Sequence, residues 1–152
     1  MKAVFMGTPE FALPCLDALL AAGHTVSGVF TQPDKPKGRG YALTPPPVKI
    51  RAEELGLPVY QPAGVRDGSA LEILRSLSPD IIVVVAYGKI LPEEILRLPR
   101  YGCLNVHASL LPRHRGASPI QWAIVSGDRE SGVTTMRMDI GMDTGDIYET
   151  AA

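Results

Sequence analysis

The sequence of 152 residues lacks most features that mark secreted, membrane or disulfide-stabilised proteins. Its two cysteines, Cys15 and Cys103, have no C-x-x-C spacing, and no His and Cys cluster has zinc spacing, so neither a disulfide framework nor a metal site is indicated. No apolar run is long enough to span a bilayer, and no secretion signal follows Met1 and Lys2. We therefore expect a cytoplasmic protein.

An excess of charge of one sign is also lacking. The 15 Lys and Arg residues and 16 Asp and Glu residues give a formal net charge of -1, so the composition by itself offers no argument for a nucleic-acid partner. The apolar fraction of 45% and the charged fraction of 20% are typical of a globular protein. The length fits one domain, residues 1–152, with a proper core.

Motifs of the common nucleotide-binding and hydrolytic enzymes are missing as well. The first turn between an expected strand and helix, residues 7–12, has a single glycine, whereas the dinucleotide fingerprint needs several. There is no Walker loop and no nucleophile elbow. These enzyme classes are therefore disfavoured.

The sequence does have a regular alternation of apolar strand-like runs and helical stretches. Strands are expected at residues 2–6, 26–31, 59–61, 81–86, 103–106, 133–138 and 146–149. Helices are expected at residues 11–22, 48–55, 69–77, 92–98 and 119–126. The β-branched run at 81–86 is typical of a central parallel strand that is covered on both faces. This alternation predicts an α/β fold with a doubly wound, mostly parallel sheet.

The ends of the first helix can also be predicted. Thr8 suits the N-cap, and Pro9 suits the first helical position because a proline has no N–H to leave unpaired there. Gly23 can end the helix in a left-handed conformation.

Residues 32–47 interrupt the alternation. Five prolines and two glycines in this stretch predict a mobile loop. Lys35, Lys37 and Arg39 also lie here, so basic charge is concentrated in the loop. A solvated charged loop is the ordinary interpretation, and a site for RNA phosphates is the alternative.

Polar side chains lie at the C-terminal end of the apolar strand at 103–106. Asn105 and His107 lie two residues apart, so on an extended chain they project to the same side, at the edge where open α/β sheets bind ligands. An amide donor and a titratable donor can together hold an oxygen that becomes negative during attack on a carbonyl. Alternatively, His107 only caps a strand end. A later Gly-rich turn carries Asp139 and Asp143, and the spacing does not choose between their carboxylates.

Several motifs together resemble those of the folate-dependent formyltransferases. They are Asn-x-His from Asn105, Ser-Leu-Leu-Pro-x-x-Arg-Gly from Ser109 and Met-Asp-Thr-Gly from Met142. The stretches 7–11 and 32–40 resemble in particular the members of this family whose acceptor is methionyl-tRNA. The resemblance covers the chain nearly from end to end.

The resemblance implies a Rossmann-like formyltransferase fold and a catalytic trio of Asn105, His107 and Asp143; it is the resemblance that selects Asp143. The amine of initiator methionyl-tRNA would attack the formyl carbonyl of 10-formyltetrahydrofolate. Asn105 and His107 would hold the oxygen of the tetrahedral intermediate. Asp143 would favour the imidazolium and help to remove the amine proton.

The resemblance also implies where the substrates bind. Two segments would line the folate site: Ser109, Leu110, Leu111 and Pro112, and Tyr87, Gly88 and Ile90. For Leu110 and Leu111, loop packing is the alternative. The basic residues Lys35, Lys37 and Arg39 would contact the phosphates of the tRNA acceptor stem. The family continues into a C-terminal β-barrel domain, so we expect residues 1–152 to be a catalytic domain that is truncated at its C-terminal end.

Two other functions remain open. The first is a formyltransferase for another amine, an amino-sugar nucleotide or glycinamide ribonucleotide. For the latter we would expect a Gly-rich phosphate loop after the first strand, which residues 7–9 do not supply. The second is a non-catalytic module that binds folate or RNA.

Overall fold

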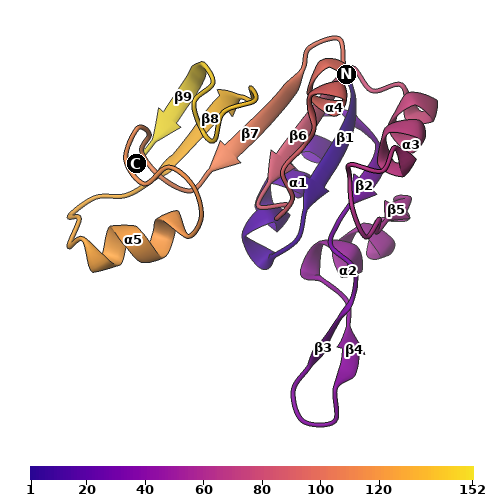
Figure 1. Cartoon of the computed structure of the whole chain (residues 1–152), viewed down its shortest axis with the longest axis horizontal. Coiled ribbons are helices and arrows are strands. Elements are labelled where there is room, and N and C mark those ends of the chain that lie inside the picture. The colour runs from indigo at the N-terminus through magenta and orange to yellow at the C-terminus, as the bar shows by residue number, and fades with distance from the viewer.

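A mixed sheet of seven strands runs through the computed structural model, which describes residues 1–152 (Figure 1). The strands are β1 (Lys2–Gly7), β2 (Thr25–Phe30), β5 (Val59–Tyr60), β6 (Ile81–Val85), β7 (Cys103–His107), β8 (Val133–Arg137) and β9 (Ile147–Ala151). Their order is β5-β2-β1-β6-β7-β8-β9, with the first five parallel and the last two antiparallel to their neighbours. The predicted doubly wound, mostly parallel sheet is confirmed.

Helices cover both faces of this sheet. They are α1 (Leu13–Ala21), α2 (Pro47–Glu54), α3 (Ser69–Leu77), α4 (Glu93–Arg97) and α5 (Pro119–Val125), and a 3-10 turn (Glu10–Ala12) precedes α1. Val83 and Val85 of β6 belong to a buried cluster that also holds residues of α1 and α2. The alternate residues Ile82 and Val84 belong to a second cluster, with residues of α3 and α4. Strand β6 is therefore buried on both faces, as its β-branched sequence predicts.

The direction of winding reverses between β1 and β6. From β1 the chain continues outward to β2 and β5, and it then returns through α3 to β6 and β7 on the other side of β1. In open α/β sheets, ligands bind outside the carboxyl ends of the strands at such a reversal. The fold therefore indicates the edge at which β1, β6 and β7 end.

The stretch predicted as a mobile loop, residues 32–47, contains a β-hairpin and the start of α2. Strands β3 (Lys35–Lys37) and β4 (Ala42–Thr44) pair antiparallel in a separate two-stranded sheet, which extends away from the rest of the chain (Figure 1). Pro36 is tolerated in β3 because the strand has no partner on its other side that would need its N–H. Residues 35–37 and 42–44 therefore form paired strands where the sequence predicted a loop.

The start of the first helix also differs from the prediction. Pro9 occupies the N-cap position of the 3-10 turn, and no side chain caps it. The Thr8 hydroxyl instead donates a hydrogen bond to the Tyr87 carbonyl oxygen, 2.8 Å away. Gly23 does end α1 in a left-handed conformation, with φ at 84°. The predicted end of the helix is thus confirmed, while Thr8 serves the turn after β6.

Candidate active site

A cavity of about 660 Å³ lies at the carboxyl ends of β1, β6 and β7. It is lined by Pro9 and Phe11, Val84 and residues 86–90, residues 105–108 and 116–121, and Met138, Met142 and Asp143. Its volume is in the range of about 300 to 1,000 Å³ that is typical of small-molecule sites. A second hollow of about 560 Å³, next to Arg97, Arg100 and Arg137, lies at the opposite edge, near the amino end of β7. Of these two, the first cavity occupies the edge indicated by the fold.

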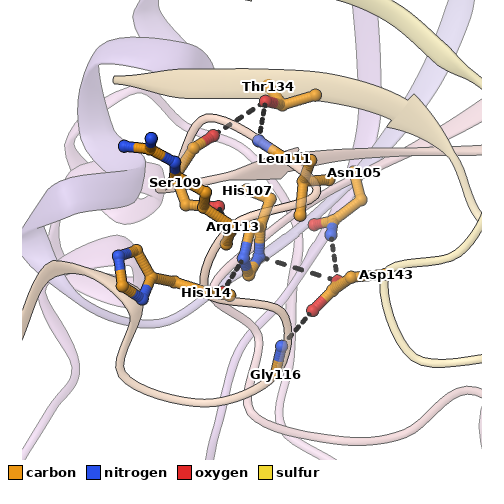
Figure 2. Close-up of polar contacts among 9 residues, drawn as sticks. All are labelled: Asn105, His107, Ser109, Leu111, Arg113, His114, Gly116, Thr134 and Asp143. Carbon is orange, nitrogen blue, oxygen red and sulfur yellow. Dashed lines mark hydrogen bonds and ion pairs between the residues drawn. The ribbon is translucent and has the colours of Figure 1, made fainter. Parts of the chain in front are cut away.

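Asn105 and His107 converge on one carboxylate oxygen in this cavity. The Asn105 Nδ2 atom lies 3.5 Å from Asp143 Oδ1, and His107 Nδ1 lies 3.6 Å from the same oxygen (Figure 2). The side chains of His107 and Asp143 are only 8% and 12% exposed. Both contacts are longer than a tight hydrogen bond. The predicted projection of Asn105 and His107 to one side is confirmed.

The structure also separates the two aspartates of the Gly-rich turn. Asp139 Oδ1 accepts hydrogen bonds from the Gly141 N–H and the Thr144 hydroxyl, each at 2.8 Å, so this carboxylate is used within the turn. Asp143 instead reaches β7, and its Oδ2 accepts a hydrogen bond of 2.7 Å from the Gly116 N–H. Asp143, and not Asp139, is therefore the carboxylate next to Asn105 and His107.

A backbone carbonyl fixes the tautomer of His107. Its Nε2 lies 2.9 Å from the His114 carbonyl oxygen (Figure 2). Because a carbonyl oxygen only accepts hydrogen bonds, Nε2 must carry a proton. The other ring nitrogen, Nδ1, faces Asp143 Oδ1. Asn105 keeps one amide N–H without a partner in the chain.

The two segments predicted to bind folate lie in different places. Tyr87, Gly88 and Ile90 line the cavity, whereas Ser109, Leu110, Leu111 and Pro112 do not. The Thr134 hydroxyl donates to the Ser109 carbonyl oxygen at 2.7 Å and accepts from the Leu111 N–H at 3.1 Å (Figure 2). Residues 109–112 are therefore held against β8, and they pack within the loop and do not form a wall of the cavity.

The turn after β6, which lines the cavity, has backbone groups without a partner in the chain. The N–H groups of Gly88, Lys89 and Ile90 donate to no atom of the chain, and the carbonyl oxygens of Lys89 and Ile90 accept from none. Side chains fix the turn from outside: Thr8 donates to the Tyr87 carbonyl oxygen, and Gln32 donates to that of Gly88 at 3.0 Å. A ligand with an amide-like edge could bind these donors and acceptors.

The Tyr87 side chain has a structural role. Its ring packs in the core cluster next to α3 and α4, and its hydroxyl has no hydrogen-bond partner. Burial raises the pKa of Tyr87 to about 12. The phenol therefore stays neutral near pH 7 and does not act as an acid or base there.

The predicted RNA-binding residues lie on the β3–β4 hairpin and not at the cavity. Lys35, Lys37 and Arg39 are exposed, and none of them forms an ion pair. Lys49 and Arg51, just beyond the hairpin, are different: Lys49 pairs with Asp34 at 3.1 Å, and Arg51 pairs with two carboxylates. The unpaired basic charge of this region therefore belongs to the hairpin.

Sequence reasoning missed the groups that orient the trio. Two of them, the His114 carbonyl and the Gly116 N–H, are backbone groups, and the residue type does not show which backbone groups face the site. Thr134 is fully buried in a strand, where threonine is common for other reasons.

No group of three or more His, Cys, Asp or Glu side chains could hold a metal ion. None of the helices combines the length and the hydropathy needed to cross a membrane.

Known structures share this fold. Phosphoribosylglycinamide formyltransferase from Bacillus halodurans superimposes with a TM-score of 0.78 at 21% identity, over 99% of this chain and 78% of its own. A formyltetrahydrofolate deformylase from Pseudomonas syringae pv. tomato gives a TM-score of 0.75 at 22% identity, over 99% of this chain and 50% of its own. At such identities the likeness shows the fold alone.

Sequence comparison is more specific. A methionyl-tRNA formyltransferase from Desulfotalea psychrophila is 62% identical over 147 residues, 97% of this chain and 46% of the relative. Another, from Pelotomaculum thermopropionicum, is 58% identical over 147 residues, 97% of this chain and 47% of the relative. The chain thus spans about half the length of the curated relatives it matches. The formyl transferase family model matches residues 1–152, and the chain belongs to this family.

Proposed function

We propose that the protein carrying this chain transfers a formyl group from 10-formyltetrahydrofolate to the amino group of initiator methionyl-tRNA. The observation that carries the proposal is the convergence of Asn105 and His107 on Asp143 inside the cavity at the carboxyl edge of the sheet. The acceptor is supported by relatives at 58% and 62% identity that are methionyl-tRNA formyltransferases.

The cavity fits the folate donor, which supplies the formyl group. Its volume of about 660 Å³ suits a small-molecule ligand, and the unpaired backbone groups of Gly88, Lys89 and Ile90 can donate to and accept from a pterin ring. Tyr87, Gly88 and Ile90 thus keep the donor-binding role expected from the sequence. For Ser109 to Pro112 we propose an indirect role, since they hold the loop that carries His107's backbone partner.

The trio divides the chemistry of acyl transfer. Asn105 has a free amide N–H, and a protonated His107 Nδ1 would lie beside it; together they can stabilise an oxygen that becomes negative. Asp143 accepts the proton that the attacking amine loses, directly or through a water molecule, and this proton passes to N10 of the folate as the bond between N10 and the formyl carbon breaks. The Gly116 N–H keeps the Asp143 carboxylate aimed at β7 while its charge is used.

The hairpin supplies the contact with the acceptor RNA. Lys35 and Lys37 are two apart on β3 and therefore project to the same side, with Arg39 in the following turn. Three unpaired cations on an exposed ribbon suit the phosphates of an acceptor stem. Since aminoacyl-tRNA is used in the cytoplasm, we place the protein there.

A transfer assay with the complete protein tests the proposal. Purified protein is mixed with 10-formyltetrahydrofolate and initiator methionyl-tRNA, and formylated methionyl-tRNA is measured over time. Asn105→Ala and His107→Ala should each lower kcat by about 100-fold or more, because each removes a donor to the developing negative charge. His24→Ala, a histidine outside the cavity, should leave kcat unchanged.

Two outcomes would refute the proposal. Absence of transfer by the unmodified protein would exclude this donor and acceptor. Transfer by the unmodified protein with near-normal kcat in both variants would remove Asn105 and His107 from the reaction. Replacing methionyl-tRNA by an amino-sugar nucleotide or glycinamide ribonucleotide in the same assay distinguishes the acceptors, and we expect no transfer to either.

A further inference from the structure

A second pair of histidine and aspartate side chains lies next to the candidate site. His114 Nε2 lies 2.7 Å from Asp128 Oδ2, the length of a charge-assisted hydrogen bond, and both side chains are 17% exposed. Neither residue lines the cavity, so the pair is not placed to touch a ligand bound there. Any effect of this pair on the reaction must therefore act through the residues that it holds.

Asp128 is itself fixed by the end of α5. Its backbone N–H donates to the Ala123 carbonyl oxygen at 3.0 Å, and the Gly127 N–H donates to that of Ile124 at 3.1 Å. Gly127 is left-handed, with φ at 71°, so these two backbone hydrogen bonds form a Schellman motif at the end of the helix. The Asp128 carboxylate thus projects from a well-defined point, and its bond to His114 ties the cap of α5 to the segment before this helix.

The segment that His114 anchors supplies two backbone groups to the trio. The His114 carbonyl oxygen lies 2.9 Å from His107 Nε2, and the Gly116 N–H donates to Asp143 Oδ2 at 2.7 Å (Figure 2). His114 has φ at 53°, a left-handed conformation that residues other than glycine keep only when their surroundings hold them. The side-chain bond to Asp128 is one such restraint on the peptide that faces His107.

We propose that His114 and Asp128 are positioning residues for the reaction. Their hydrogen bond fixes the backbone of residues 114–116. This backbone in turn keeps the proton of His107 on Nε2, turns Nδ1 toward Asp143 and aims the Asp143 carboxylate. Groups that orient a catalytic imidazole in this way determine its tautomer and its direction. The effect on turnover rests on the proposed formyl transfer, whereas the effect on the His107 tautomer does not.

The kinetic test uses the complete protein. Asp128→Ala should lower kcat by about 10-fold or more with little change in KM for either substrate, because misplacing catalytic groups slows the chemical step more than it weakens binding. Asp128→Asn keeps an oxygen that can accept from His114 and should recover most of the lost kcat. Glu130→Gln removes an equal charge from an exposed residue of the same loop that makes no ion pair, and it should behave as the unmodified protein.

A second readout follows the His107 ring directly. In protein with ¹⁵N-labelled histidine, NMR shifts of the His107 ring nitrogens should show a proton on Nε2, and Asp128→Ala should shift the tautomer distribution. Should Asp128→Ala not fold, His114→Phe keeps a ring at this position but cannot bond to Asp128, and it has the same expected outcome.

The outcomes separate this inference from the proposed function. If the unmodified protein transfers no formyl group, the proposed function is wrong, and the tautomer measurement still tests the pair. If it transfers normally, and the variant without the His114–Asp128 bond keeps both its kcat and its His107 tautomer, the positioning role is overturned. A rise in KM alone, with kcat and tautomer unchanged, also overturns it, since it would indicate a role in binding.

Discussion

The segment that follows β7 and the β3–β4 hairpin are held in opposite ways. Residues 107–116 are hydrogen-bonded to β8, to Asp143 and to the residue after the cap of α5, and Ser109 in this segment is fully buried. The hairpin, in contrast, exposes every residue from 35 to 43. Its attachment lies at its base, where Asp34 accepts hydrogen bonds from Lys49 and Gln61.

This difference matches the two tasks that we propose. Acyl transfer needs donors that are already in place when charge develops, because moving them during the reaction would cost part of the stabilisation. Binding of an RNA backbone depends on charge that reaches the phosphates, and a projecting ribbon can adjust to them. The segment after β7 therefore needs many restraints, while the hairpin needs few.

The largest effect is expected at the carboxylate of the trio. Asp143→Asn should lower kcat by about 100-fold, because the amide cannot accept the amine proton. Asp139→Asn is the matched control, since its oxygen can still accept the bonds of the turn. Single-turnover formyl transfer measures both. Equal losses in the two variants would show that the turn, and not the position of Asp143 beside His107, determines activity.

The sequence predicts elements well where one pattern dominates. Helix α3 spans the predicted residues 69–77, and the β-branched run of β6 lies in mid-sheet as expected. The hairpin escaped prediction because its turn uses left-handed Gly38, Gly40 and Tyr41 instead of a two-residue signal such as Asn-Gly. Thr8 has a residue type that is common at helix N-caps, but its hydroxyl donates a hydrogen bond to the Tyr87 carbonyl oxygen instead.

The candidate site was likewise predictable from the sequence only in part. Strand periodicity is enough to bring Asn105 and His107 to one side. The choice of Asp143 needed the family resemblance, because both aspartates of the turn have the same local chemistry and only the folded turn separates them. The backbone groups of residues 114 and 116 could not be predicted, since their direction depends on left-handed conformations and on the contact with Asp128.

A smaller effect, on stability, is expected from the residue that holds the segment after β7. Thr134→Val removes a hydroxyl that bonds both the Ser109 carbonyl oxygen and the Leu111 N–H, and it leaves these groups unpaired in a buried position. The free energy of unfolding should fall by about 2 kcal/mol or more, measured by urea denaturation. Thr135→Val, next to it on β8 with an exposed hydroxyl contact, should change little. Similar values for both would mean that the segment is less restrained than its hydrogen bonds indicate.

The smallest effect on the fold, and a specific one on binding, is expected at the hairpin. Replacing Lys35, Lys37 and Arg39 together by glutamine should leave the free energy of unfolding unchanged, because these exposed side chains make no ion pairs. Affinity for methionyl-tRNA should fall. The slope of the logarithm of affinity against the logarithm of salt concentration should become shallower by about 2 to 3, since up to three phosphate contacts are lost.

A control with the same change in net charge separates contact from general attraction. Arg66, Arg75 and Arg129 are exposed and unpaired on other parts of the surface, and replacing them by glutamine removes three positive charges as well. If the hairpin contacts the RNA, this variant should keep a steeper salt dependence than the hairpin variant. Equal slopes would mean that only net charge matters, and the hairpin would then have no particular part in binding the acceptor.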